Sequence, residues 1–99
     1  MKLEIMRDIL GEVVTERNKQ DARWGEQNHK PIEWCAILGE EVGEVNKAAL
    51  QAHFDSANQG DEYTTAQLEE YRAELVQVAA VAVAMIQSLD RNELNKLNA

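Results

Sequence analysis

The chain is poor in cysteine, proline and basic side chains, and these shortages exclude several classes of protein. Its one cysteine, Cys35, cannot form an intrachain disulfide, so a reducing compartment is expected. The 18 acidic and 10 basic side chains give a formal charge of -8, which argues against a general nucleic-acid binder. No apolar run approaches the roughly 20 residues that span a bilayer, and the charged N-terminus is unlike a signal peptide. We therefore expect a cytoplasmic protein that binds neither nucleic acid nor a membrane.

A single all-α domain, a helical bundle, is expected over residues 1–99. Apolar residues at helical spacing predict three long helices and a short C-terminal helix. The first covers residues 3–19, the second residues 31–54, and the third begins near a cap at Thr64 or Thr65. The short helix covers about residues 90–97, with Asp90 as its cap. Residues 20–30 and 55–62 connect the long helices, and Pro31 suits a first helical turn.

The third helix contains an apolar run over residues 75–86, in which Gln77 is the only polar side chain. A helix that is apolar on all sides must be covered on all sides, and three helices in a chain of 99 residues cannot easily do this. The bundle is therefore expected to be completed by homodimerisation. Gly39 and Gly43, four apart on the second helix, predict the close approach of another helix or of a ligand, because each weakens the helix by about 1 kcal/mol.

Three carboxylates lie within five residues of the second helix, at Glu40, Glu41 and Glu44. At about 100° per residue, Glu41 falls within the apolar stripe, Glu44 flanks it and Glu40 points outward. Glu74 on the third helix faces the same interior as the apolar residues around it. Buried carboxylates are costly unless they are neutralised. Either arginines or lysines of other helices neutralise them, or they bind a divalent cation such as Mg²⁺, which prefers oxygen ligands, with the Gln77 carbonyl beside them.

Basic side chains concentrate around residues 17–30, where Arg23 and Lys30 accompany Trp24 and His29. A nucleobase could stack on Trp24 while phosphates meet Arg23 or Lys30. The alternative, that Trp24 packs on the core and the cations are solvated, stays open. An acidic line at i, i+4 spacing along the first helix is interpreted as a solvated face; it consists of Glu4, Asp8, Glu12 and Glu16.

The carboxylate stretch carries a family resemblance. Residues 38–45, Leu-Gly-Glu-Glu-Val-Gly-Glu-Val, resemble the Glu-Glu-x-x-Glu motif of the MazG-like nucleotide pyrophosphohydrolases, in the all-α NTP pyrophosphatase superfamily. The second motif of that family is Glu-x-x-Asp on the next long helix, and Glu74-Leu-Val-Gln77 occupies its place. Some relatives also have an aromatic residue and a His-x-Pro sequence before the first motif, which Trp24 and the segment His29-Lys-Pro resemble.

The resemblance implies an Mg²⁺-dependent enzyme, with Mn²⁺ as a possible substitute, that hydrolyses a nucleoside triphosphate or its deoxy form to the monophosphate and pyrophosphate. It implies helical dimers or tetramers. The metal ligands would be Glu41, Glu44 and Glu74, and Glu40 would aid water activation. Candidates for contact with the base or the phosphates are Arg23, Trp24, His29, Lys30 and Trp34, although Trp34 lies on the apolar stripe and suits the core.

Gln77 departs from the family pattern, because a neutral amide binds Mg²⁺ more weakly than a carboxylate and cannot act as a base. The rival hypothesis is therefore a helical dimer that binds a nucleotide or a protein partner without hydrolysis. A purely structural module is a third hypothesis, and it leaves Glu41 and Glu74 inside apolar faces without a purpose.

Overall fold

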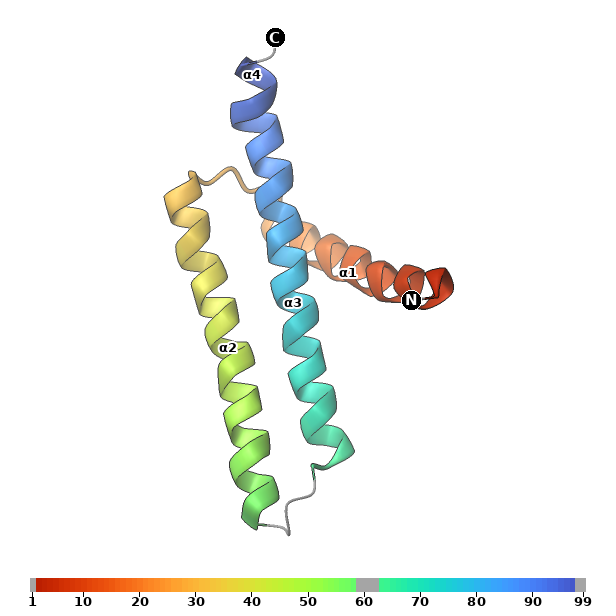
Figure 1. Cartoon of the computed structure of the whole chain (residues 1–99). Helices are drawn as coiled ribbons and strands as arrows, with labels where there is room; N and C mark the ends of the chain where they lie inside the picture. Colours follow the sequence, from red (N-terminus) through yellow and green to blue (C-terminus); the bar gives the residue numbers. More distant parts are fainter. Residues whose placement is uncertain (1, 59–62, 98–99) are drawn as a thin grey trace.

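The structure, a computed structural model, describes residues 2–58 and 63–97, and it contains helices and no strand over those residues. The elements are α1 (Leu3–Trp24), α2 (Pro31–Asn58) and α3 (Thr65–Leu89), then a π-helical turn, η1 (Asp90–Leu94), and a last turn, α4 (Asn95–Leu97). Helices α2 and α3 lie side by side and antiparallel, whereas α1 packs on α3 and leaves this pair at a steep angle (Figure 1). The predicted all-α class is confirmed.

Both long N-terminal helices extend further than predicted. Helix α1 ends at Trp24 rather than at residue 19, because residues 20–24 include good helix formers and Arg17 donates to Gln20 at 3.1 Å and to Asp21 at 2.9 Å, one turn further on. Helix α2 ends at Asn58 rather than at residue 54. The rest of the predicted connection, residues 59–62, lies outside the described residues.

Gly25 ends α1 with φ 72° and ψ -171°, a backbone conformation that is almost exclusive to glycine. No atom lies within 4 Å of the position that a Cβ would take, so Gly25→Ala tests backbone strain alone. We expect this substitution to lower the free energy of unfolding in urea by about 1–3 kcal/mol. The control is Gly11→Ala, because Gly11 is helical with equally open space and should gain up to about 1 kcal/mol. Equal effects of the two substitutions would contradict strain at Gly25.

Helix α3 begins as predicted and ends differently. Thr64 caps it through a capping box, in which the Thr64 hydroxyl accepts from the Gln67 N–H at 3.1 Å and the Gln67 side chain accepts from the Thr64 N–H at 2.9 Å. The prediction of a separate final helix capped by Asp90 is wrong. Asp90 has helical φ and ψ of -60° and -47°, whereas a cap residue is normally non-helical. Residues 90–97 are helical, but they continue α3 through the π-helical turn.

The core of the single chain is thin. Among the described residues, seven hydrophobic side chains are buried, and four of these are alanines; they are Val13, Trp34, Ala48, Ala52, Ala80, Val81 and Ala84. The accessible surface of the chain is 7332 Å², against roughly 5,700 Å² for a folded monomer of 11.2 kDa. The radius of gyration is 16.6 Å, against about 13 Å for a compact domain of this length. The chain is therefore elongated and leaves unusually much surface exposed.

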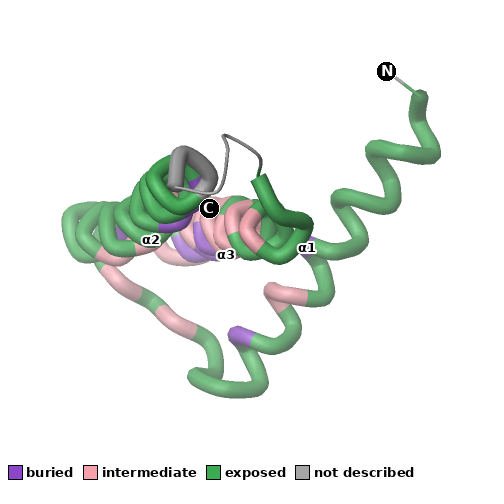
Figure 2. Tube along the Cα trace, turned by 90° about the horizontal axis from the view of Figure 1, so that it is seen from below, coloured by how far each residue is buried: buried purple, intermediate pink, exposed green. Residues whose placement is uncertain are grey.

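Much of the exposed surface is apolar, especially on α1, where every residue from 3 to 12 is exposed (Figure 2). Met6, Ile9 and Leu10 are 40–54% exposed on α1, and Phe54 on α2 and Ile86 on α3 are 61% and 58% exposed. An alanine Cβ at Gly39 or Gly43 would meet no atom of another described element within 4 Å, so neither glycine allows a close approach between the described helices. By length and composition alone, the helix Thr65–Leu97 could also cross a membrane, a test that core helices of soluble proteins pass as well.

Candidate functional site

The carboxylates of α2 and α3 lie on the faces that helical phase predicts. Glu41 is half-buried on α2, while its neighbours Glu40 and Glu44 are exposed. Glu74 is half-buried on α3, the helix that packs along α2. No ion pair found among the described residues includes Glu41, Glu44 or Glu74. Within the part of the chain that the structure describes, arginine or lysine therefore does not neutralise this cluster.

These carboxylates destabilise one another's charged forms. The pKa of Glu74 is raised by burial first, then by the negative charges of Glu70, Glu41 and Glu44 and by a hydrogen bond with the Glu70 side chain. The pKa of Glu41 is likewise raised by burial first, then by the charges of Glu44, Glu40 and Glu16. All the charges that act on these two groups are negative. A cation placed among them would relieve the repulsion and favour ionisation.

The described residues contain no group of three His, Cys, Asp or Glu side chains already gathered closely enough to hold a metal ion. The carboxylates are nevertheless of the chemical type that Mg²⁺ prefers. Glu41 and Glu44 are three residues apart on α2 and so share a side of it, and the charges of both reach Glu74 on α3. Binding a metal would thus require movements that bring these carboxylates together.

Glu16 is the group that the sequence reasoning missed. It was assigned to a solvated face, but it is half-buried and its charge acts on Glu41. Glu16 also lines a groove between α1 and α3 together with Gln77 and Lys19. Gln77 therefore lies on the α1 side of the carboxylates. Spacing along one helix could not reveal this, because the contact depends on how α1 crosses α3.

An apolar cavity of about 320 Å³ lies between α2 and the C-terminal part of α3. His29 and Trp34 line it, and their rings are T-shaped, with centroids 4.9 Å apart and planes at 82°. Trp34 is 4% exposed and belongs to the core. Its Nε1 and the Nε2 of His29 are buried and have no hydrogen-bond partner among the described residues, which is costly unless a ligand or water satisfies them. Leu38 also lines this cavity, one helical turn before Glu41.

The other predicted substrate contacts lie outside that cavity. Trp24 is 56% exposed, and the Arg23 guanidinium lies 5.2 Å from its ring centroid in a cation–π contact. Both line the α1–α3 groove that contains Gln77. Lys30 is exposed, and its backbone N–H donates to the Glu33 carboxylate at 2.8 Å at the start of α2. Arg23 and Trp24 thus line the groove and His29 and Trp34 line the cavity, whereas Lys30 lines neither.

Neither a known protein family, nor a curated protein, nor a solved structure matches this chain.

Proposed function

We propose that the protein is an Mg²⁺-dependent nucleoside triphosphate pyrophosphohydrolase, which converts an NTP or dNTP and water to the monophosphate and pyrophosphate. The observation that supports this proposal is the carboxylate cluster of α2 and α3, in which Glu41 and Glu74 carry raised pKa values and have no cationic partner among the described residues. Such a cluster is costly for folding alone. The same cluster becomes favourable when it binds a divalent cation together with the phosphates of a nucleotide.

In this proposal Glu41, Glu44 and Glu74 hold the metal, and the Gln77 carbonyl or the Glu16 carboxylate completes the site on the α1 side. The bound metal would polarise the phosphate oxygens and favour attack by water. Glu40 is exposed next to this site, and it orients the attacking water. The phosphates would carry further negative charge into this site, and Arg23 and Lys30 are the candidates to neutralise it.

The base of the nucleotide would enter the cavity between α2 and the C-terminal part of α3, which His29 and Trp34 line. The cavity is apolar and of a suitable size for a small planar ring. Two of the residues that line it, His29 and Trp34, carry buried ring nitrogens without a partner in the described part of the chain, and these would hydrogen-bond the polar edge of the base. Trp24, which is exposed beside Arg23, offers a second stacking surface for a base or sugar.

The proposal is tested by incubating the full chain with a panel of ribo- and deoxynucleoside triphosphates and Mg²⁺ or Mn²⁺. We expect pyrophosphate release from at least one nucleotide and none in EDTA. Release of orthophosphate instead of pyrophosphate would show that the terminal phosphate is cleaved rather than the bond between the α and β phosphates. The absence of pyrophosphate across the whole panel at high protein concentration would overturn the proposed activity.

Gln77 supports a second candidate function, nucleotide binding without hydrolysis, because an amide is a weaker metal ligand than the family's aspartate. Gln77→Asp is therefore informative. If Gln77 contacts the metal, the new carboxylate should lower the Mg²⁺ concentration for half-maximal activity severalfold, and calorimetry should show tighter Mg²⁺ binding. Glu69→Asp on the same helix is the control, since it changes an exposed carboxylate that does not act on Glu41 or Glu74. An unchanged Mg²⁺ titration of Gln77→Asp would exclude contact with the metal.

We also propose that the chain acts as a cytoplasmic homodimer, which a further pairing could make a tetramer. The support is the surface excess of about 1,600 Å² per chain over a compact monomer. Two such faces would make an interface in the range of obligate dimers, which bury about 2,000–5,000 Å² in total.

The oligomeric state is measured by sedimentation at micromolar concentration, where we expect the mass of two chains or of four. Ile9→Glu, on the exposed apolar face of α1, should shift the protein towards the monomer, because a buried unpaired charge is strongly unfavourable. Lys2→Glu is the control, since Lys2 is exposed and polar. A stable monomer of the unmodified chain would refute the proposal.

A further inference from the structure

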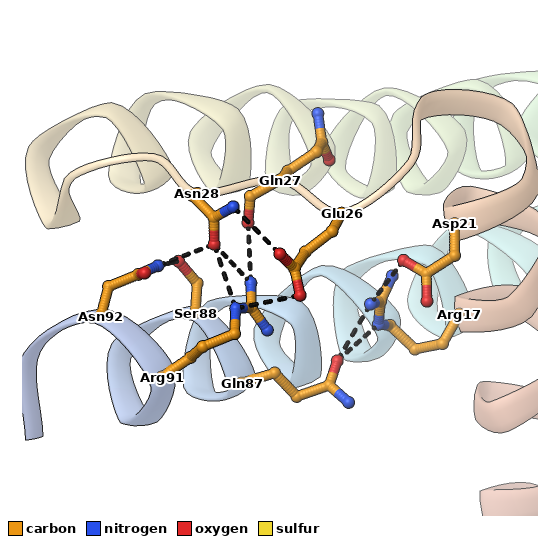
Figure 3. Close-up of polar contacts among 9 residues, drawn as sticks. All are labelled: Arg17, Asp21, Glu26, Gln27, Asn28, Gln87, Ser88, Arg91 and Asn92. Atoms are coloured by element: carbon orange, nitrogen blue, oxygen red, sulfur yellow. Dashed lines mark hydrogen bonds and ion pairs between the residues drawn. The ribbon is translucent and has the colours of Figure 1, made fainter. Parts of the chain in front are cut away.

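The loop between α1 and α2 is fastened to the end of α3 by a group of polar contacts (Figure 3). The Arg91 guanidinium donates to the Asn28 side-chain oxygen from Nε at 3.1 Å and from Nη2 at 2.7 Å, and Nη2 also donates to the Gln27 carbonyl at 3.1 Å. Its Nε lies 3.2 Å from the Glu26 carboxylate. The Asn92 amide donates to the same Asn28 oxygen at 2.8 Å. Arg91 therefore holds three consecutive residues of the loop.

The π-helical turn explains why Arg91 reaches this loop. Its backbone bond joins the Asn95 N–H to the Asp90 carbonyl, five residues apart rather than four. This turn carries Arg91 and Asn92 on the side of the helix that faces residues 26–28, where Asn92 also donates to the buried Ser88 hydroxyl at 3.3 Å (Figure 3). Isolated π-helical turns are uncommon and occur often at functional sites.

His29 directly follows the residue that Arg91 holds most closely. On the other side, the loop begins at Gly25, whose backbone is in a glycine-specific conformation, and it ends where α2 starts at Pro31. His29 lies edge to face with Trp34 at 4.9 Å and forms part of the cavity wall. Its contact with Trp34 is thus made by a short loop segment that is held at Asn28 by residues of η1.

We propose that Arg91 is a positioning residue, which acts through Asn28 to hold the His29 ring against Trp34 and so keeps the cavity in its ligand-binding form. The predicted effect of Arg91 on nucleotide affinity rests on the proposed function, whereas its predicted effect on the position of His29 does not. When the loop is released, only a fraction of the molecules have His29 in place, and the apparent dissociation constant rises in inverse proportion to that fraction.

The planar guanidinium is essential to this role, because it donates to the Asn28 side chain and the Gln27 carbonyl at the same time. Lysine keeps the positive charge near Glu26, but it cannot present two donors in a fixed fork. Arg91→Lys should therefore release the loop in part, Arg91→Ala should release it more fully, and Asn28→Ala should do the same from the loop side without altering α3.

The matched control is Arg72→Lys. Arg72 on α3 also makes a forked contact with another helix, since its Nη1 and Nη2 each lie 2.6 Å from a carboxylate oxygen of Glu12 on α1. Arg72 lies several helical turns before Arg91 in the sequence. A general loss of α1–α3 packing would make Arg72→Lys resemble Arg91→Lys, whereas positioning of His29 would not.

The primary measurement is the NMR spectrum of the His29 ring, whose signals should be displaced by the ring current of Trp34 in the unmodified protein, because the two ring centroids lie 4.9 Å apart. We expect this displacement to be largely lost in Arg91→Ala and Asn28→Ala, reduced in Arg91→Lys and kept in Arg72→Lys, with helix content by circular dichroism unchanged. The second measurement is calorimetric binding of nucleoside monophosphates, for which a fall of the competent fraction to about one tenth raises the dissociation constant about tenfold.

The two measurements separate the two proposals. If the unmodified chain binds no nucleotide, the proposed function fails, and the His29 signals still decide the role of Arg91. If these signals are unchanged in both Arg91→Ala and Asn28→Ala, the positioning role is overturned. Should Arg91→Ala not fold, Arg91→Lys and Asn28→Ala carry the same test.

Discussion

Glu41→Gln is expected to lower the rate of pyrophosphate release about 1,000-fold. A bound divalent cation contributes several kcal/mol of transition-state stabilisation, and each 1.36 kcal/mol corresponds to a factor of ten in rate. Glu41 is the most buried of the three α2 carboxylates, and its charge also acts on Glu74 across the helix pair. Removing it should therefore disturb both halves of the proposed metal site. The measurement is the steady-state release of pyrophosphate at saturating Mg²⁺.

The variant should remain folded, because burial and three neighbouring carboxylates already raise the pKa of Glu41 and penalise its charged form. The control is Glu4→Gln, which removes an exposed carboxylate near the start of α1. Activity of Glu41→Gln equal to that of Glu4→Gln would place the reaction elsewhere, even if the unmodified chain hydrolyses nucleotides.

Features set by local sequence were predicted well. The apolar run of residues 75–86 lies within α3 and Thr64 caps this helix as expected, because cap chemistry and helical periodicity are properties of neighbouring residues. The relative burial of Glu40, Glu41 and Glu44 also follows from phase alone. The errors lie at helix ends. Continuation past residue 19 depends on side-chain bonds of Arg17, and continuation past Asp90 depends on a π-helical turn that has no simple sequence pattern.

Features set by the crossing of helices were not predictable from this one sequence. The sequence predicted that Glu16 belongs to an exposed line of acidic residues on α1. Because of the way α1 crosses α3, Glu16 is the member of that line whose charge raises the pKa of Glu41. Glu12 in the same line instead pairs with Arg72, which lowers the pKa of Glu12 through a hydrogen bond. The Arg91 contacts join residues more than 60 positions apart. Spacing within a helix carries no information about such pairs.

Glu74→Gln is expected to stabilise the metal-free protein and to abolish its stabilisation by Mg²⁺. Burial, the charges of Glu70, Glu41 and Glu44, and a hydrogen bond with Glu70 raise the pKa of Glu74 above the ordinary value of 4.5. At pH 7 the ionised group therefore opposes folding. Relief of like-charge contacts of this kind is worth roughly 0.5 kcal/mol, or about 2–4 °C in Tm for a chain of this size. Glu69→Gln is the control, since Glu69 does not act on Glu74.

Mg²⁺ should stabilise the unmodified protein. Mg²⁺ at 100 times its dissociation constant adds about 2.7 kcal/mol to the free energy of unfolding, which corresponds to 10 °C or more in Tm. Because Glu74 would be a ligand, Glu74→Gln should lose most of this gain while Glu69→Gln keeps it. Thermal unfolding with and without Mg²⁺ measures both effects, and an equal Mg²⁺ response of the two variants would remove Glu74 from the metal site.

The pH dependence of the stability of the metal-free protein is a second test of the role of Glu74. A carboxyl group whose pKa is higher in the folded chain than in the unfolded chain binds its proton more tightly when folded, so stability falls as pH rises from the ordinary value of 4.5 through the folded pKa. Glu12, whose pKa is lowered, acts in the opposite direction and only below about pH 4.5. The metal-free chain should therefore become more stable as the pH is lowered from 7 towards 5. Glu74→Gln should flatten this slope, and saturating Mg²⁺ should reverse it in the unmodified chain, because protons and the cation compete for the same oxygens.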